Sequence, residues 1–122
     1  MKIILLLLIT LISQTSYTQT NSNNCIQANN NSRIVVAGGS ITEIIYLLEN
    51  ENKIIAVDVT SVYPEKANEK PNIGYVRNLS VEGIISISPT LIIGEDDMGP
   101  PNVIKQLEKL KIDVKIIEEK QT

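Results

Sequence analysis

Histidine, phenylalanine and tryptophan are absent from this 122-residue chain, and cysteine occurs only once. Without histidine the chain lacks the usual general base and the commonest protein ligand for metals, which excludes most Ser-His and Cys-His catalysis. The single Cys25 has no partner for an internal disulfide. The net charge is −3 and no basic patch stands out, so we expect no nucleic-acid partner.

The residues that are present divide the chain into three parts. Residues 1–20 are typical of a secretory signal peptide, because Lys2 precedes an apolar run, 3–12, that is too short to span a bilayer. Residues 21–32 are rich in asparagine and lack apolar periodicity, which indicates a flexible lead-in. Residues 33–122 are expected to form the folded domain of an exported protein; an uncleaved membrane anchor or a mis-assigned start stays open as the alternative.

Short apolar runs alternate with segments of helical spacing, and this order predicts the fold of the domain. Four short runs, rich in Ile, Leu and Val, predict strands at 34–37, 54–57, 90–93 and 114–117. Helices are expected between them, from Ser40, from Ser80 and from Pro100, and Ser40 with Glu43 has the spacing of a capping box. The residues predicted to face inward are Ile41, Ile44, Ile45, Leu48, Val81, Ile84, Ile85, Val103, Ile104, Leu107 and Leu110. This order predicts an α/β fold, a parallel four-stranded sheet with helices on both faces.

The loops that follow the strands are the expected place for a ligand, because open parallel sheets bind ligands at the carboxyl ends of their strands. In one of these loops Tyr75 and Arg77 lie two residues apart, so an extended segment would present both on the same side. A phenolate can ligate haem iron, and a neighbouring guanidinium favours the phenolate over the phenol. On residue chemistry alone, a surface tyrosine beside a solvated arginine is the simpler interpretation.

Four segments together resemble a known family. Residues 33–45, 57–64, 73–84 and 88–92 are similar to the haemin-binding proteins of bacterial haem ABC importers. Those proteins belong to the larger class of periplasmic binding proteins for cobalamin and ferric siderophores. The most specific motifs are Asp58-x-Thr60-Ser61-x-Tyr63-Pro64 and Gly74-Tyr75-x-Arg77-x-Leu79-Ser80, and they favour haem over cobalamin.

The resemblance implies a haem bound in a cleft between two α/β lobes, of which residues 33 to about 117 correspond to the N-terminal lobe. Tyr75 corresponds to the tyrosine that ligates the iron, Arg77 to the arginine beside it, and Glu82 to a surface acid that contacts the membrane permease. Counterparts of the second lobe, the connecting helix and a second axial histidine are missing, so a separate chain could supply that lobe. We expect a periplasmic binding protein without catalytic residues, whose partners are haem and an ABC permease.

Several alternatives stay open from the residues. The turn at Gly39 and Ser40 could bind a haem propionate, or a phosphate ester in a small α/β enzyme, although a tight turn with an N-cap is the simpler interpretation. Tyr63 could support the haem or serve only in packing. The acidic segment 95–97 is expected to be solvated in preference to binding Ca²⁺. Cobalamin or a ferric siderophore could replace haem as the ligand.

Overall fold

A computed structural model describes residues 28–120; the expected signal peptide, 1–20, and most of the asparagine-rich lead-in lie outside this range. The core is a four-stranded parallel sheet with the strand order β2-β1-β5-β6. Its strands are β1 (Ile34–Ala37), β2 (Ile54–Val57), β5 (Leu91–Glu95) and β6 (Asp113–Ile117). This confirms the predicted α/β architecture. Within residues 28–120, no helix is long and apolar enough to cross a membrane.

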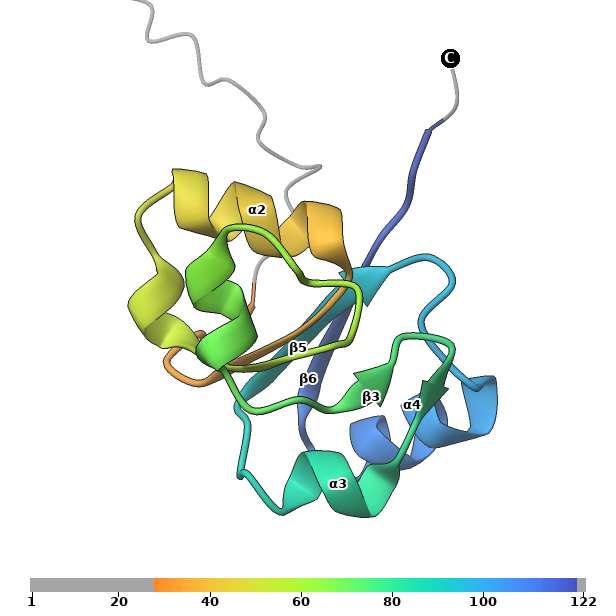
Figure 1. Ribbon diagram of the computed structural model, residues 1–122. Helices are drawn as coiled ribbons and strands as arrows, with labels where there is room; N and C mark the ends of the chain where they lie inside the picture. Colours follow the sequence, from red (N-terminus) through yellow and green to blue (C-terminus); the bar gives the residue numbers. More distant parts are fainter. Residues whose placement is uncertain (1–27, 121–122) are drawn as a thin grey trace, which may run out of the picture.

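Helices cover both faces of the sheet (Figure 1). Helix α2 (Gly39–Leu47) lies on one face, whereas α3 (Val81–Ile85) and α4 (Pro101–Lys109) lie on the other, and two 3-10 turns, η1 (Glu51–Lys53) and η2 (Glu65–Glu69), flank β2. Side chains of a strand alternate between the faces. On β1, Ile34 and Val36 therefore join the core under α2, while Val35 and Ala37 join the larger core under α3 and α4.

Two predictions about the first helix are wrong. Helix α2 begins at Gly39, one residue earlier than expected, so Ser40 lies inside its first turn and Gly38 holds the cap position without a side-chain hydrogen bond. The Ser40 hydroxyl instead donates to Glu95 at the end of β5. Of the expected apolar stripe, only Ile41 and Ile45 pack on the sheet. Two residues of this stripe are exposed, Ile44 and Leu48. Two residues of the later helices that were also predicted to face inward are exposed as well, Ile85 and Leu110.

A hairpin that the sequence did not indicate connects η2 to α3. It pairs β3 (Gly74–Tyr75) with β4 (Asn78–Leu79), and its tip is the turn at Val76 and Arg77. Val76 and Leu79 are buried with Met98 in the larger core. Two backbone hydrogen bonds, from Gly99 N to Val76 O and from Leu79 N to Gly99 O, both 2.9 Å, tie the hairpin to residues 95–100, which we call the rim loop.

Candidate functional site

Tyr75 and Arg77 lie at the tip of this hairpin. Tyr75 is the last residue of β3 and its side chain is 44% exposed, while Arg77 is exposed in the turn. Val76 between them is buried, which anchors the tip and leaves its two neighbours facing solvent. The segment is therefore a hairpin and not the continuous extended segment that was expected, although it still presents both side chains outward.

The guanidinium of Arg77 is paired with the rim loop. Its Nε donates to Asp97 Oδ2 over 2.6 Å. This hydrogen bond raises the pKa of Arg77, and the negative charge of an ionised Tyr75 raises it further, so the two tip residues are close enough to interact electrostatically. Asp97 Oδ1 is buried and has no hydrogen-bond partner among the described residues. The acidic segment is thus not simply solvated, because Asp97 belongs to the structure of the rim.

The turn at Gly39 and Ser40 is closely packed. A Cβ atom at position 39 would lie 2.7 Å from the backbone oxygen of Thr60, so the approach of α2 to the loop after β2 requires glycine there. Ser40 is exposed, and its hydroxyl is engaged by the carboxylate of Glu95. A carboxylate beside this turn disfavours the phosphate-binding interpretation, because two anions would face each other.

Ser40 and Arg77 line one hollow of about 440 Å³, which we call the rim hollow. It lies where β1, β5 and β6 end, the edge at which a ligand was expected. Apolar and acidic side chains share it: Arg77 is the one basic residue of its lining and faces five carboxylates. The complete lining is Ser40, Ile41, Ile44, Arg77, Glu95, Asp96, Asp97, Ile117, Glu118 and Glu119.

Tyr63 is not brought to the rim hollow. Its side chain is 65% exposed and lines a separate hollow of about 340 Å³ against the outer side of α2. Tyr46 and Leu47 of that helix line the same hollow, together with Pro64. This geometry therefore does not support the predicted role of Tyr63 in supporting the haem.

Glu82 lies exposed in the first turn of α3. Ser80 caps this helix by accepting a hydrogen bond from Gly83 N over 3.2 Å, and the Ser80 hydroxyl donates to Glu82 Oε2 over 3.1 Å. A hydrogen bond from its own backbone N–H, followed by that from Ser80, lowers the pKa of Glu82. The side chain is therefore a charged surface acid at neutral pH.

A buried polar cluster around Asp58 lies behind the rim, and its hydrogen bonds were not predicted from the sequence. The Asp58 carboxylate accepts hydrogen bonds from Gly38 N, from the Thr60 hydroxyl and backbone N–H, and from the Ser61 hydroxyl. Ser61 is in turn hydrogen-bonded to Thr42 of α2 over 2.7 Å. An aspartate followed by Thr and Ser two and three residues later is typical of such local turns, and that spacing was the available signal.

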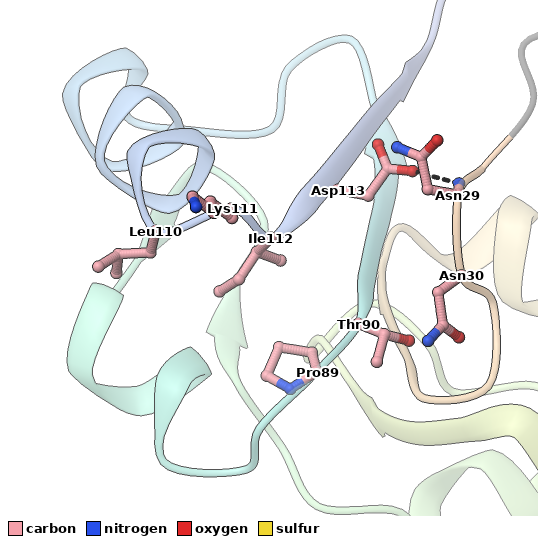
Figure 2. A pocket seen from close by; sticks show the side chains of 8 residues that line it. All are labelled: Asn29, Asn30, Pro89, Thr90, Leu110, Lys111, Ile112 and Asp113. Carbon is pink, nitrogen blue, oxygen red and sulfur yellow. Dashed lines mark hydrogen bonds between the residues drawn. The ribbon is translucent and has the colours of Figure 1, made fainter.

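A further hollow, of about 540 Å³, lies at the opposite end of the sheet, where β5 and β6 begin (Figure 2). Figure 2 shows Asn29 and Asp113 next to each other on its wall; Asn29 N donates to Asp113 Oδ2 over 2.8 Å. Its position at the amino ends of the strands is the wrong edge for a ligand of an open parallel sheet. Among residues 28–120, no three His, Cys, Asp or Glu side chains are grouped to hold a metal ion.

Comparisons with known proteins agree with this fold. A periplasmic haem-binding protein of Pseudomonas aeruginosa is 40% identical and superimposes with a TM-score of 0.70 over 71% of this chain and 31% of its own. The haem-binding protein HutB of Vibrio cholerae is 43% identical, with a TM-score of 0.66 over 72% of this chain and 34% of its own. A vitamin B12-binding protein of Vibrio parahaemolyticus is 34% identical over 65% of this chain and 28% of its own.

This chain thus spans about a third of the length of these relatives, and the shared part is their N-terminal lobe. The sequence profile described as periplasmic binding protein matches residues 34–122, which include nearly all of the fold described above. The chain therefore belongs to the periplasmic binding protein family.

Proposed function

We propose that this chain binds haem as the N-terminal lobe of the substrate-binding component of an ABC importer. The observation that carries the proposal is the exposed Tyr75 at the tip of a hairpin that Val76 and Leu79 anchor in the core. The tip offers a phenol at a fixed position without burying it. The similarity to haem-binding structures at 40% and 43% identity supports the same ligand.

The chemistry of the tip suits ferric iron. An oxidised, hard iron prefers an anionic oxygen ligand, and a phenolate supplies one. Arg77 places a positive charge two residues from Tyr75 at the same hairpin tip. Exposed isoleucines beside the tip, Ile44 and Ile117, offer apolar surface to a porphyrin edge. In this proposal haem is cargo, so the iron needs one protein ligand from this lobe and no catalytic group.

Delivery of the haem to a membrane permease is proposed on the same family grounds. The protein would be exported to the periplasm by the segment 1–20 and would dock on the ABC permease at the inner membrane. Glu82 is placed for one docking contact, because it is exposed and charged on a short capped helix. A second lobe would complete the cleft, since a single lobe covers only one side of a bound porphyrin.

Cobalamin is the second candidate ligand, and the identity to vitamin B12-binding relatives favours it. The five carboxylates of the rim hollow also suit a ligand without carboxylates better than they suit the propionates of haem. Competition decides between the two. If cobalamin displaces bound haemin and itself binds more tightly, then the haem assignment is wrong while the transport role stands.

The small phosphate-binding enzyme has no comparable support. The family consists of substrate-binding proteins, and the turn that would receive a phosphate has Gly39 packed against Thr60 and Ser40 bound to a carboxylate. We therefore propose a binding protein without catalytic activity. A phosphate ester that raised the melting temperature of the chain would contradict this.

The decisive experiment is a haemin titration of the full chain, followed by visible absorption, in three forms. The unaltered chain is expected to give a saturable ligand-field spectrum of tyrosinate-ligated ferric haem. Tyr75→Phe should abolish that spectrum, because it removes only the ligating oxygen. Tyr63→Phe is the matched control: it removes an exposed phenol from a different hollow, and the spectrum should survive. An unchanged spectrum in Tyr75→Phe would refute the assignment.

A further inference from the structure

The contact between Arg77 and Asp97 has a consequence for the ligand. Arg77 is the one basic residue in the lining of the rim hollow and is therefore the natural partner for a ligand carboxylate there. Its Nε is already bound to Asp97 Oδ2 over 2.6 Å. A guanidinium that is paired with a carboxylate has less charge to offer a second one.

The backbone holds the two residues together. The rim loop and the hairpin share hydrogen bonds at both sides of the tip, from Gly99 N to Val76 O and from Leu79 N to Gly99 O. Met98, next to Asp97, is buried against the core residues of the hairpin. These contacts do not involve either charged side chain, so the backbone by itself holds positions 77 and 97 close enough for Arg77 and Asp97 to pair.

The second oxygen of Asp97 strengthens this interpretation. Asp97 Oδ1 is buried and has no partner among the described residues. Leaving a buried carboxylate oxygen unpaired is unfavourable, so a carboxylate at this position is not explained by stability. An apolar residue at position 97 would avoid this cost. A role at the binding edge explains the acid better.

Resting on the haem-binding function proposed above, we propose that Asp97 is a specificity-determining residue that withholds Arg77 from ligand carboxylates. This lobe then selects a porphyrin by iron ligation at Tyr75 and by apolar contact, and it gains nothing from the propionates. The remaining carboxylates of the rim hollow act in the same direction, because they repel anionic ligand groups.

Two ligands that differ only in their carboxylates test this proposal. Haemin and haemin dimethyl ester share the iron and the ring, and each is titrated into the full chain in the same dilute non-ionic detergent. The unaltered chain should bind the ester at least as tightly as haemin, because the carboxylates of the rim hollow repel the propionates. Asp97→Asn should shift the ratio of the two dissociation constants about two- to fivefold in favour of haemin, the range expected of one released surface charge. Adding Arg77→Gln to Asp97→Asn should return the ratio to that of the unaltered chain.

Asp96→Asn is the matched control, because it removes one carboxylate from the same hollow without touching the hydrogen bond to Arg77. If Asp96→Asn shifts the ratio as much as Asp97→Asn does, or if the shift persists without Arg77, general repulsion explains the result and the proposal is wrong. Failure of every form to bind either ligand would overturn the haem-binding function itself, and the specificity proposal with it.

A ligand-free measurement separates these failures. In the nitrogen-15 NMR spectrum of the unaltered chain, the Arg77 Nε–H should exchange slowly with water because it is hydrogen-bonded, and Asp97→Asn should accelerate that exchange. Rapid exchange in the unaltered chain would show that Arg77 is free, and it would overturn the proposal whatever the ligand. Slow exchange together with a shifted ratio in Asp97→Asn supports it.

Discussion

The backbone N–H of Gly38 donates to Asp58 Oδ1 over 3.0 Å and so joins the turn after β1 to the end of β2. Asp58 is 1% exposed, and hydroxyl groups of Thr60 and Ser61 satisfy the rest of its carboxylate. A buried carboxylate is tolerated only when its hydrogen bonds are made. These bonds shape the two loops from which α2 and the hairpin approach the rim.

We expect Asp58→Ala to be among the most damaging single substitutions in the chain. It would leave the N–H of Gly38 and the two hydroxyl groups without their acceptor, at an expected loss of about 3 kcal/mol or more in the free energy of unfolding. Urea unfolding measures it. Asp96→Ala, at an exposed acid of the rim loop, is the control and should change stability by less than about 0.5 kcal/mol. Equal effects would contradict the buried network.

Two glycines should respond in opposite directions to alanine. A Cβ at Gly39 would lie 2.7 Å from a backbone oxygen, so Gly39→Ala forces α2 away from the loop and should cost about 1–3 kcal/mol. A Cβ at Gly83, in helix α3, meets only Ser80 side-chain atoms at 3.6 Å. Gly83→Ala should therefore stabilise the chain by about 0.5–1 kcal/mol. Thermal unfolding of both variants checks the prediction, and destabilisation by Gly83→Ala would count against it.

Helix α4 supplies a matched pair of leucines. Leu107 is fully buried under the sheet, whereas Leu110 at the end of the helix is 54% exposed. Leu107→Ala should cost about 2–5 kcal/mol, because it removes buried methyl groups and leaves a cavity. Leu110→Ala should cost less than about 1 kcal/mol. Similar losses in urea unfolding would show that the helix is rotated relative to this packing.

Asp113 should make the stability of the chain depend on pH at the acid end. A hydrogen bond from Lys115, with the backbone N–H of Asn29 second, lowers the pKa of Asp113 below its ordinary value of 3.8. Because the folded pKa lies below the unfolded one, the contribution is present above the unfolded pKa and is lost as pH falls through the folded pKa.

Urea unfolding near pH 6 and near pH 3 measures this contribution. Asp113→Asn should lose less stability between the two pH values than the unaltered chain does, and Glu108→Gln, at an exposed acid, is the control. A pH dependence that Asp113→Asn leaves unchanged would assign the effect to other acids.

Some strands and helices of this chain were predicted from the sequence and others were not. The apolar runs at 34–37 and 54–57 are strands with the predicted bounds, and Pro101 opens α4 as its position predicted. The spacing of apolar residues and the positions of proline are local signals, and each of these strands and helices forms from consecutive residues. The hairpin at 74–79 was missed because its two strands have two residues each and no period can show in so short a stretch. Ile44 and Leu48 have helical spacing, but spacing cannot tell how much of a helix the sheet covers.

The candidate site divides in the same way. The residue types at positions 75 and 77 and the place of their loop after the second strand follow from the chain itself, because the order of elements along the chain can be read from the sequence. The partners of those residues do not. Arg77 meets Asp97 across 20 positions, Ser40 meets Glu95 across 55, and Gly38 meets Asp58 across 20. Only the parallel sheet, which places the ends of distant strands at one edge, decides which charges become neighbours there.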